Sequence, residues 1–100
     1  MAKLTVVYWR DIPAQVIVRA GRESAKRALG ERFETAIDRA AMTAGLYGSD
    51  DYLDQWRRGE ATDVGDDLEA EADRAAERLD ADYDDARLKA LVHGGGLDDG

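Results

Sequence analysis

Hydrophobic and polar residues alternate over residues 4–19, LTVVYWRDIPAQVIVR, the only stretch of the chain dense in β-branched and aromatic residues. Side chains of a strand point to opposite faces with period two, so this pattern predicts two strands. The chain must reverse at residues 10–13, where proline fixes its own φ. One predicted face is apolar and carries Leu4, Val6, Tyr8, Ala14, Val16 and Val18. The other is mixed and carries Thr5, Val7, Trp9, Gln15, Ile17 and Arg19. The stretch predicts a hairpin in a half-covered sheet.

Apolar residues then recur every three or four positions over residues 23–44, which predicts an amphipathic helix. Ser24 is its predicted N-cap, and Gly45 can take the left-handed conformation after the last turn. Gly30 lies inside this predicted helix at a cost of about 1 kcal/mol relative to alanine, and close approach to the sheet would explain it. Phe33 is expected near the centre of the core.

The second half of the chain predicts two more helical regions. A short helix over residues 50–58 would end at Gly59, with acidic residues in its first turn and arginines in its last. Residues 60–64 could add a third strand to the sheet, and the pattern leaves this open. A long helix over residues 66–83, capped by Asp66, is followed by a second apolar set at Leu88, Leu91 and Val92, with or without a break.

These elements predict the fold class. We expect an α+β domain over residues 1–93, with a small antiparallel sheet led by the hairpin. The helices of residues 23–44 and 66–83 would both pack on its apolar face, and the short helix would lie between them in the chain. Residues 94–100, rich in glycine, have nothing to bury and are expected to be disordered.

The composition shows an uneven distribution of charge along the chain and excludes several kinds of chemistry. The net charge is −8, but residues 1–48 hold eight Lys and Arg against five acids, and residues 49–100 hold six against seventeen. The acidic half is either a solvated helix surface or a steering field for a partner. Cysteine is absent, which removes disulfides and thiolate chemistry, and no run is long and apolar enough for a membrane span. We expect a soluble, cytoplasmic protein.

No catalytic or metal site can be selected from the spacing of the residues. Asp80, Asp82 and Asp84 copy the start of a calcium loop, but Asp85 replaces its glycine and Leu91 its bidentate glutamate. The single histidine, at position 93, has no second ligand nearby. We therefore expect no cofactor, no metal and no catalytic residue, and the negative charge disfavours a nucleic-acid partner.

The mixed face and tip of the hairpin are the candidate partner-binding site, built on Val7, Trp9, Arg10, Asp11 and Ile17. Tryptophan and arginine are enriched among interface hot spots, and an uncovered apolar patch usually marks an interaction site. The competing interpretation packs Trp9 on Trp56 or Phe33 and leaves Arg10 and Asp11 as an ion pair. A protein partner or a second copy of the chain would satisfy the patch equally well.

At YWRDIPAQV, residues 8–16, the chain resembles the small bacterial virulence factor domain family, and the likeness runs from residue 3 to about residue 92. It includes the segments GRESAKRALGERFETAIDRAAMTAGL, DYLDQWRRGE and LEAEADRAAERLDADYD. Members of that family are short stand-alone proteins in proteobacteria, and the family is similar to a module of conserved virulence factor C proteins. The resemblance implies no catalytic residue.

The resemblance also implies two functions. Members tend to be encoded near folate- and corrinoid-dependent methyl-transfer proteins, which implies an accessory role. The leading hypothesis is a non-enzymatic accessory or adaptor protein that docks on a larger protein. The alternative is a small subunit that completes a folate- or corrinoid-dependent one-carbon methyl-transfer system. The sequence does not identify the partner.

Overall fold

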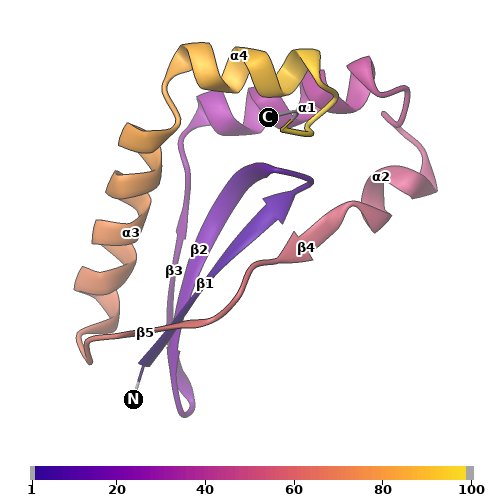
Figure 1. Ribbon diagram of the computed structural model, residues 1–100. Helices are drawn as coiled ribbons and strands as arrows, with labels where there is room; N and C mark the ends of the chain where they lie inside the picture. The colour runs from indigo at the N-terminus through magenta and orange to yellow at the C-terminus, as the bar shows by residue number, and fades with distance from the viewer. Residues whose placement is uncertain (1, 99–100) are drawn as a thin grey trace.

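Residues 2–98 are described by the computed structural model, in which an antiparallel sheet carries helices on one face and beyond one end (Figure 1). The strands are β1 (Ala2–Trp9), β2 (Ile12–Ala20), β3 (Glu23–Ala28), β4 (Trp56–Arg58) and β5 (Thr62–Val64). The helices are α1 (Glu31–Thr43), α2 (Asp50–Asp54), α3 (Leu68–Asp82) and α4 (Asp85–His93). The sheet order is β3-β2-β1-β4, and β5 also pairs with β1. The predicted α+β class is confirmed.

The predicted hairpin is present, but its turn is shorter than expected. Only Arg10 and Asp11 lie between the strands, and Arg10 has a φ of 54°. Two-residue hairpin turns use left-handed backbone because it matches the twist of the strands. Pro13 lies inside β2, opposite Tyr8, where the register shifts between Val7 and Tyr8. An irregular position of this kind tolerates the missing N–H of proline.

The prediction of one helix over residues 23–44 is wrong for its first third. Residues Glu23–Ala28 form β3, which pairs with β2 from Ala20 opposite Glu23 to Gln15 opposite Ala28. Their helix-favouring composition is overridden because β2 offers a free edge one tight turn away, at Gly21 (φ 62°). Gly30 is the N-cap of α1, so it does not lie inside a helix and Ser24 caps nothing.

The prediction of a helix over residues 50–58 is also wrong in its second half. Helix α2 ends at Asp54, and the next residues form β4 opposite the end of β1, with Trp9 facing Trp56 and Val7 facing Arg58. The arginines of β4 therefore do not lie in a last helical turn. The open question of a third strand is answered by β5, whose Val64 pairs with Ala2. Strand β1 thus has partners on both edges.

The C-terminal region contains two helices with a break. Asp67, one residue beyond the predicted cap, accepts from the backbone N–H of Ala70 at the start of α3, and Asp84 caps α4. The expectation that the glycine-rich segment has nothing to bury is wrong for Gly95 and Gly96, which are both buried. Gly96 is buried against Trp9, and its carbonyl accepts from the Asp11 N–H at 2.8 Å. Residues 99 and 100 lie outside the described residues.

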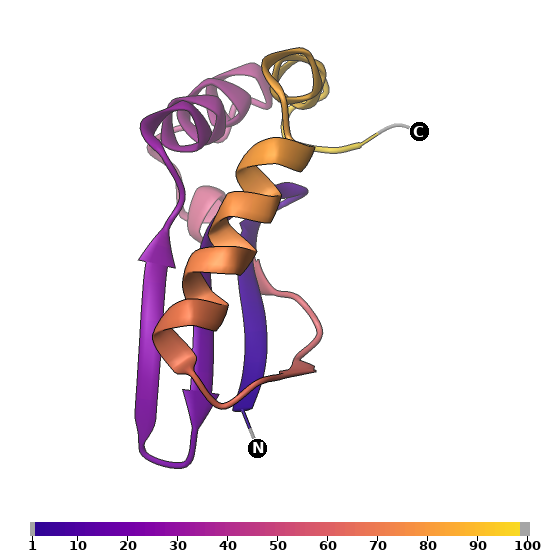
Figure 2. The ribbon, with the colours of Figure 1, turned by 90° about the vertical axis from the view of Figure 1, so that its left-hand side faces the viewer.

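The helices form two packing regions, and only one of them is on the sheet face. Helix α3 crosses that face (Figure 2), whereas α1 and α4 lie side by side beyond the hairpin tip (Figure 1). Of the two long helices that were predicted to pack against the sheet, α3 lies along its face and α1 contacts β2 near the hairpin tip. The "base core" under α3 consists of Ala2, Val16, Val18, Ala25, Ala72 and Ala75. The "tip core" consists of Trp9, Ile12, Phe33, Ala36, Ile37, Ala40, Ala41, Leu88 and Leu91.

Within residues 2–98, no helix combines the length and the apolar character needed to cross a membrane.

Candidate functional site

Trp9, the central residue of the predicted partner-binding set, is part of the core. Its side chain is 0% exposed, and its Nε1 donates a hydrogen bond to the Tyr52 carbonyl at 2.9 Å. Its ring lies 5.4 Å from the ring of Tyr52, and it belongs to the same core as Phe33. The packing interpretation of Trp9 therefore holds, and this residue offers no surface to a partner.

Arg10 and Asp11 fasten the hairpin tip to other parts of the chain. The Arg10 guanidinium lies 5.4 Å from the Trp9 ring centroid and donates to the Gln55 Oε1 at 3.1 Å and to the Gly95 carbonyl at 3.0 Å. Asp11 accepts from the Arg57 guanidinium at 3.1 Å. Each residue thus has a structural partner from a different segment, and a partner-binding role for the pair stays a prediction.

Val7 and Ile17, on the sheet face opposite α3, differ in exposure. We call this face, with Lys3, Thr5, Val7, Gln15, Ile17 and Arg19, the outer face. Ile17 is only 4% exposed between its cross-strand neighbours Thr5 and Lys26. Val7 lines an open apolar cleft. Of the five predicted residues, Val7 is the one that lines this cleft.

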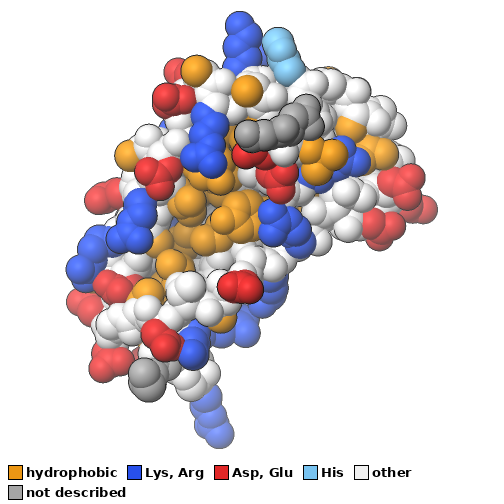
Figure 3. Space-filling model, in the orientation of Figure 1, with side chains coloured by type: hydrophobic (Ala, Val, Ile, Leu, Met, Phe, Trp, Pro, Cys, Tyr) orange, Lys and Arg blue, Asp and Glu red, His pale blue; other side chains and the backbone are white. Residues whose placement is uncertain are grey.

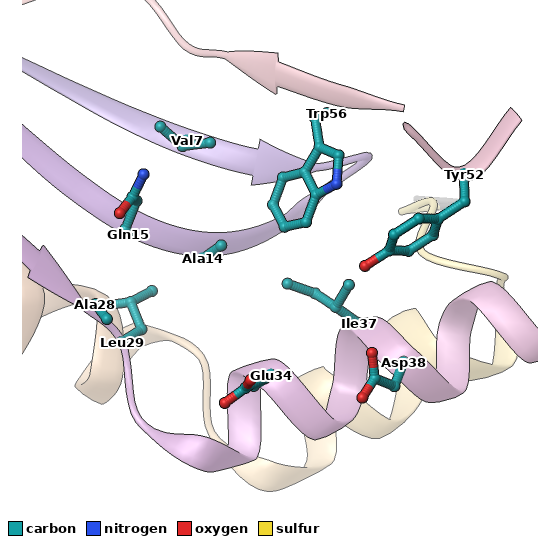
Figure 4. Close-up of a pocket in the computed structure, with 10 residues that line it drawn as sticks. All are labelled: Val7, Ala14, Gln15, Ala28, Leu29, Glu34, Ile37, Asp38, Tyr52 and Trp56. Atoms are coloured by element: carbon teal, nitrogen blue, oxygen red, sulfur yellow. The ribbon is translucent and has the colours of Figure 1, made fainter. Parts of the chain in front are cut away.

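The cleft lies between the outer face and α1 and encloses about 580 Å³ (Figure 4). We call it the α1 cleft. Its lining consists of Val7, Ala14, Gln15, Ala28, Leu29, Glu34, Ile37, Asp38, Tyr52 and Trp56. Figure 4 shows that side chains from the sheet, α1 and the α2–β4 segment surround one space, with the aromatic rings at one end. The volume falls in the range of about 300–1,000 Å³ typical of ligand sites.

Strand register and small residues create this space. Val7, Gln15 and Ala28 are cross-strand neighbours on β1, β2 and β3, so they share the outer face. The N–H of Leu29 donates to the carbonyl of Ala14 at 2.9 Å, after which the chain turns at Gly30 into α1. Ala14 and Ala28 fill little volume, and α1 packs mainly on the residues of the tip core. The gap between helix and sheet is therefore left open.

The aromatic end of the cleft comes from two elements. Tyr52 lies in α2, and Trp56 opens β4, with ring centroids 6.2 Å apart at 83°. The Trp56 side chain is 37% exposed, whereas Trp9 on the paired strand is buried. A large exposed ring on a rigid strand is the kind of contact that carries binding energy at interfaces.

The rim of the cleft is acidic. Glu34 and Asp38 lie one helical turn apart on α1, and both line the cleft. Burial raises the pKa of the Tyr52 phenol, and Asp38 and Tyr47 raise it further. The hydroxyl therefore stays protonated at neutral pH and can donate a hydrogen bond. The arrangement suits an apolar group attached to a cation.

A second hollow lies on the opposite side of the sheet, beside α3. Figure 3 shows hydrophobic side chains gathered there between α3, α4 and the β4–β5 segment, with Lys and Arg beside them. The guanidiniums of Arg57 and Arg87 lie over the rings of Tyr8 and Tyr83, at 4.5 Å and 3.9 Å. Acidic side chains line this hollow as well, so its charges are largely balanced within the chain. The α1 cleft is the better candidate.

Sequence reasoning missed most of the cleft. Of the residues that line it, Val7 alone belonged to the predicted partner-binding set, although Tyr52 and Trp56 line the cleft beside it. The acidic rim was not found, because residues 23–44 were interpreted as one helix on the other face of the sheet. The only sequence signal for the rim is the four-residue spacing of Glu34 and Asp38.

In residues 2–98, no three His, Cys, Asp or Glu side chains are grouped so that they could hold a metal ion. A family model described as "Virulence factor" matches residues 7–92 of the 100-residue chain. No curated protein and no solved structure matches the chain.

Proposed function

The chain belongs to the virulence factor family, and on that premise we propose that it is a non-enzymatic accessory protein that docks on a larger protein through the α1 cleft. The observation that carries the proposal is the cleft itself. A chain with 36% charged residues leaves an aromatic and aliphatic cavity of about 580 Å³ open to solvent. Exposed apolar surface of this kind usually marks an interaction site.

The occupant is an apolar side chain of the partner protein, next to a lysine or arginine. The floor and the aromatic end of the cleft would bury the apolar side chain, which gives most of the affinity. The two carboxylates on α1 would then face the neighbouring cation, and charge complementarity of this kind fixes register and excludes wrong partners. Acidic partner residues would be repelled at this rim, so the residue of the partner that lies beside the apolar side chain is a cation.

A variant that fills the cleft tests the proposal. Ala28 is exposed at the end of β3 and lines the cleft, so Ala28→Trp should obstruct it without opening the core. Ala86, exposed on α4 and outside the cleft lining, provides the matched control Ala86→Trp. Affinity purification from the native host identifies the partner, and the dissociation constant is then measured with purified proteins. We expect at least tenfold weaker binding for Ala28→Trp and no change for the control.

Two outcomes would contradict the proposal. Equal binding by both tryptophan variants would show that the partner does not enter the cleft. Recovery of a folate or corrinoid enzyme whose turnover falls when this chain is removed would instead favour the small-subunit alternative.

The acidic rim is tested separately. Glu34→Lys should weaken association by about 1 kcal/mol or more, since it places a cation against the partner's cation. Glu77→Lys, an exposed residue of α3, makes the same change of charge away from the cleft. If the two variants bind equally well, the occupant has no cation at the rim.

A further inference from the structure

The outer face holds a second depression, and its lining is cationic. A hollow of about 300 Å³ is lined by Lys3, Thr5, Ile17, Arg19, Gly21 and Arg58. We call it the cationic depression. It contains three cations and no acid, in a chain whose net charge is −8. The cations come from β1, β2 and β4, so their proximity depends on the pairing of three strands.

Two of these cations are not neutralised within the described part of the chain. Lys3 pairs with Asp63 on β5. The side chains of Arg19 and Arg58 make no hydrogen bond or ion pair within residues 2–98, whereas Arg27, Arg32 and Arg57 each bind a carboxylate. Acidic residues are abundant in the second half of the chain, yet the fold places none in the lining of the depression. Two guanidiniums are therefore available to an anion.

The depression and the α1 cleft lie on the same face at a defined separation. Val7 lines the cleft, and Lys3 and Thr5 line the depression on the same side of the same strand. Arg58, opposite Val7, reaches the depression from the neighbouring strand. At about 3.4 Å per residue, Val7 and Lys3 are about 14 Å apart along β1. An extended segment of about four residues spans that distance.

We propose that the cationic depression binds the acidic end of the partner segment whose apolar side chain enters the α1 cleft. This inference rests on the proposed docking function. Carboxylates are suited to the depression because guanidiniums hold them with paired, charge-assisted hydrogen bonds. The partner segment then carries a cation, an apolar residue and, about four residues away, one or more acids. The acidic rim of the α1 cleft binds a cation and the cationic depression binds an anion, so the segment can bind in only one direction.

The alternative polyanion, a nucleic acid, fits this surface less well. A patch of three cations neutralises few phosphates, and the rest of the chain repels a phosphate backbone because its net charge is −8. The acidic rim of Glu34 and Asp38 lies farther along the same face, in the path of a continuous polyanion. A short acidic peptide meets only the depression.

The test is an NMR titration of the full chain with a tetraglutamate peptide at low ionic strength. Shifts should be confined to amides around Lys3, Thr5, Arg19 and Arg58, and should diminish as salt is added. The double variant Arg19→Glu with Arg58→Glu should bind at least tenfold more weakly. The double variant Arg39→Glu with Arg78→Glu, which changes two exposed helical arginines by the same charge, should bind like the wild type.

Three results would overturn the inference. The first is the absence of shifts at the depression, and the second is equal weakening by both double variants, which would indicate net charge alone. The third is tighter binding of a ten-nucleotide single strand at the same residues, which would assign the depression to nucleic acid. None of them affects the test of Ala28→Trp, so failure of the depression is distinguishable from failure of the cleft.

Discussion

The tip core and the base core join helices to the same hairpin in different ways. The tip core uses large side chains from distant parts of the chain, including Trp9 in β1, Phe33 in α1 and Leu88 in α4. The base core uses mainly alanine and valine, with Ala72 and Ala75 of α3 fully or nearly buried. Small residues allow α3 to approach the sheet closely, whereas the tip core depends on the volume of its rings.

This difference explains where the candidate site lies. Helix α3 is held against one sheet face over its length, and Arg27 of β3 also binds Glu69 and Asp73 at its edge. Helix α1 is held by the tip core and α4, so the outer sheet face has no helix packed along it. The α1 cleft and the cationic depression both lie on that uncovered face. Because α3 covers one face of the sheet and α1 packs beyond the tip, the other face stays open for binding.

The largest expected effect comes from the central ring of the tip core. Trp9→Ala should lower the free energy of unfolding by about 4 kcal/mol, because it removes a fully buried indole and its hydrogen bond to Tyr52. Trp56→Ala makes the same change at a partly exposed position of the paired strand and should cost less than about 1.5 kcal/mol. Denaturant titration measures both, and equal losses would contradict the assigned core.

Phe33→Ala should lower the free energy of unfolding by about 3 kcal/mol, since the ring is 1% exposed and packs edge-on against Tyr83 at 6.1 Å. This variant removes volume from the α1 side of the tip core. A loss below about 1 kcal/mol in a denaturant titration would show that α1 is not held by this core.

In the base core, a substitution that enlarges a buried side chain tests how closely α3 approaches the sheet. Ala72→Leu should destabilise the protein by about 2 kcal/mol, because there is no room for a larger side chain between α3 and the sheet. Ala81→Leu, at an exposed position of the same helix, should change the free energy of unfolding by less than about 0.5 kcal/mol. If thermal and denaturant unfolding do not distinguish the two variants, α3 does not depend on close approach.

The glycine-rich segment adds to the tip core and can be tested by adding one methyl group. Gly96 has a φ of 94°, and a Cβ there would lie 2.7 Å from Cζ3 of Trp9. Gly96→Ala should therefore cost about 2 kcal/mol, from backbone strain and the clash together. Gly48 has a φ of 78° and open space around it, so Gly48→Ala should cost only about 1 kcal/mol. Equal costs for the two variants would show that Gly96 does not pack against Trp9.

The smallest effect is a dependence of stability on alkaline pH. Burial raises the pKa of Tyr83 above its ordinary value of 10.0, against the lowering effect of Arg87. The unfolded state then loses the proton first, so the free energy of unfolding falls as pH rises above about 10. Tyr83→Phe should reduce this fall. Denaturant titrations of the wild type and of Tyr83→Phe at pH 9, 10 and 11 measure the slope, and an identical slope in both proteins would contradict the burial of Tyr83.

Local sequence patterns predicted the hairpin, the α+β class and a long helix over residues 66–83, which the structure has at Leu68–Asp82. The patterns are period-two alternation over residues 4–19 and apolar recurrence every three or four residues. The motif at residues 8–16 indicated the family. The third strand and the break before Asp85 were left as alternatives, because short segments carry too little pattern to decide. Val7 was placed on the correct face by alternation alone.

The remaining strands and both candidate sites depend on contacts between segments that are far apart in the chain. Residues 23–28 have helix-favouring composition and become a strand because β2 presents an unpaired edge next to them, and residues 56–58 follow β1 for the same reason. Once β3 is a strand, α1 starts later and packs beyond the tip, which opens the cleft and brings Glu34 and Asp38 to its rim. The cationic depression needs the register of three strands at once. Pairing between distant segments has no local periodicity, so these sites appear only when the chain is folded.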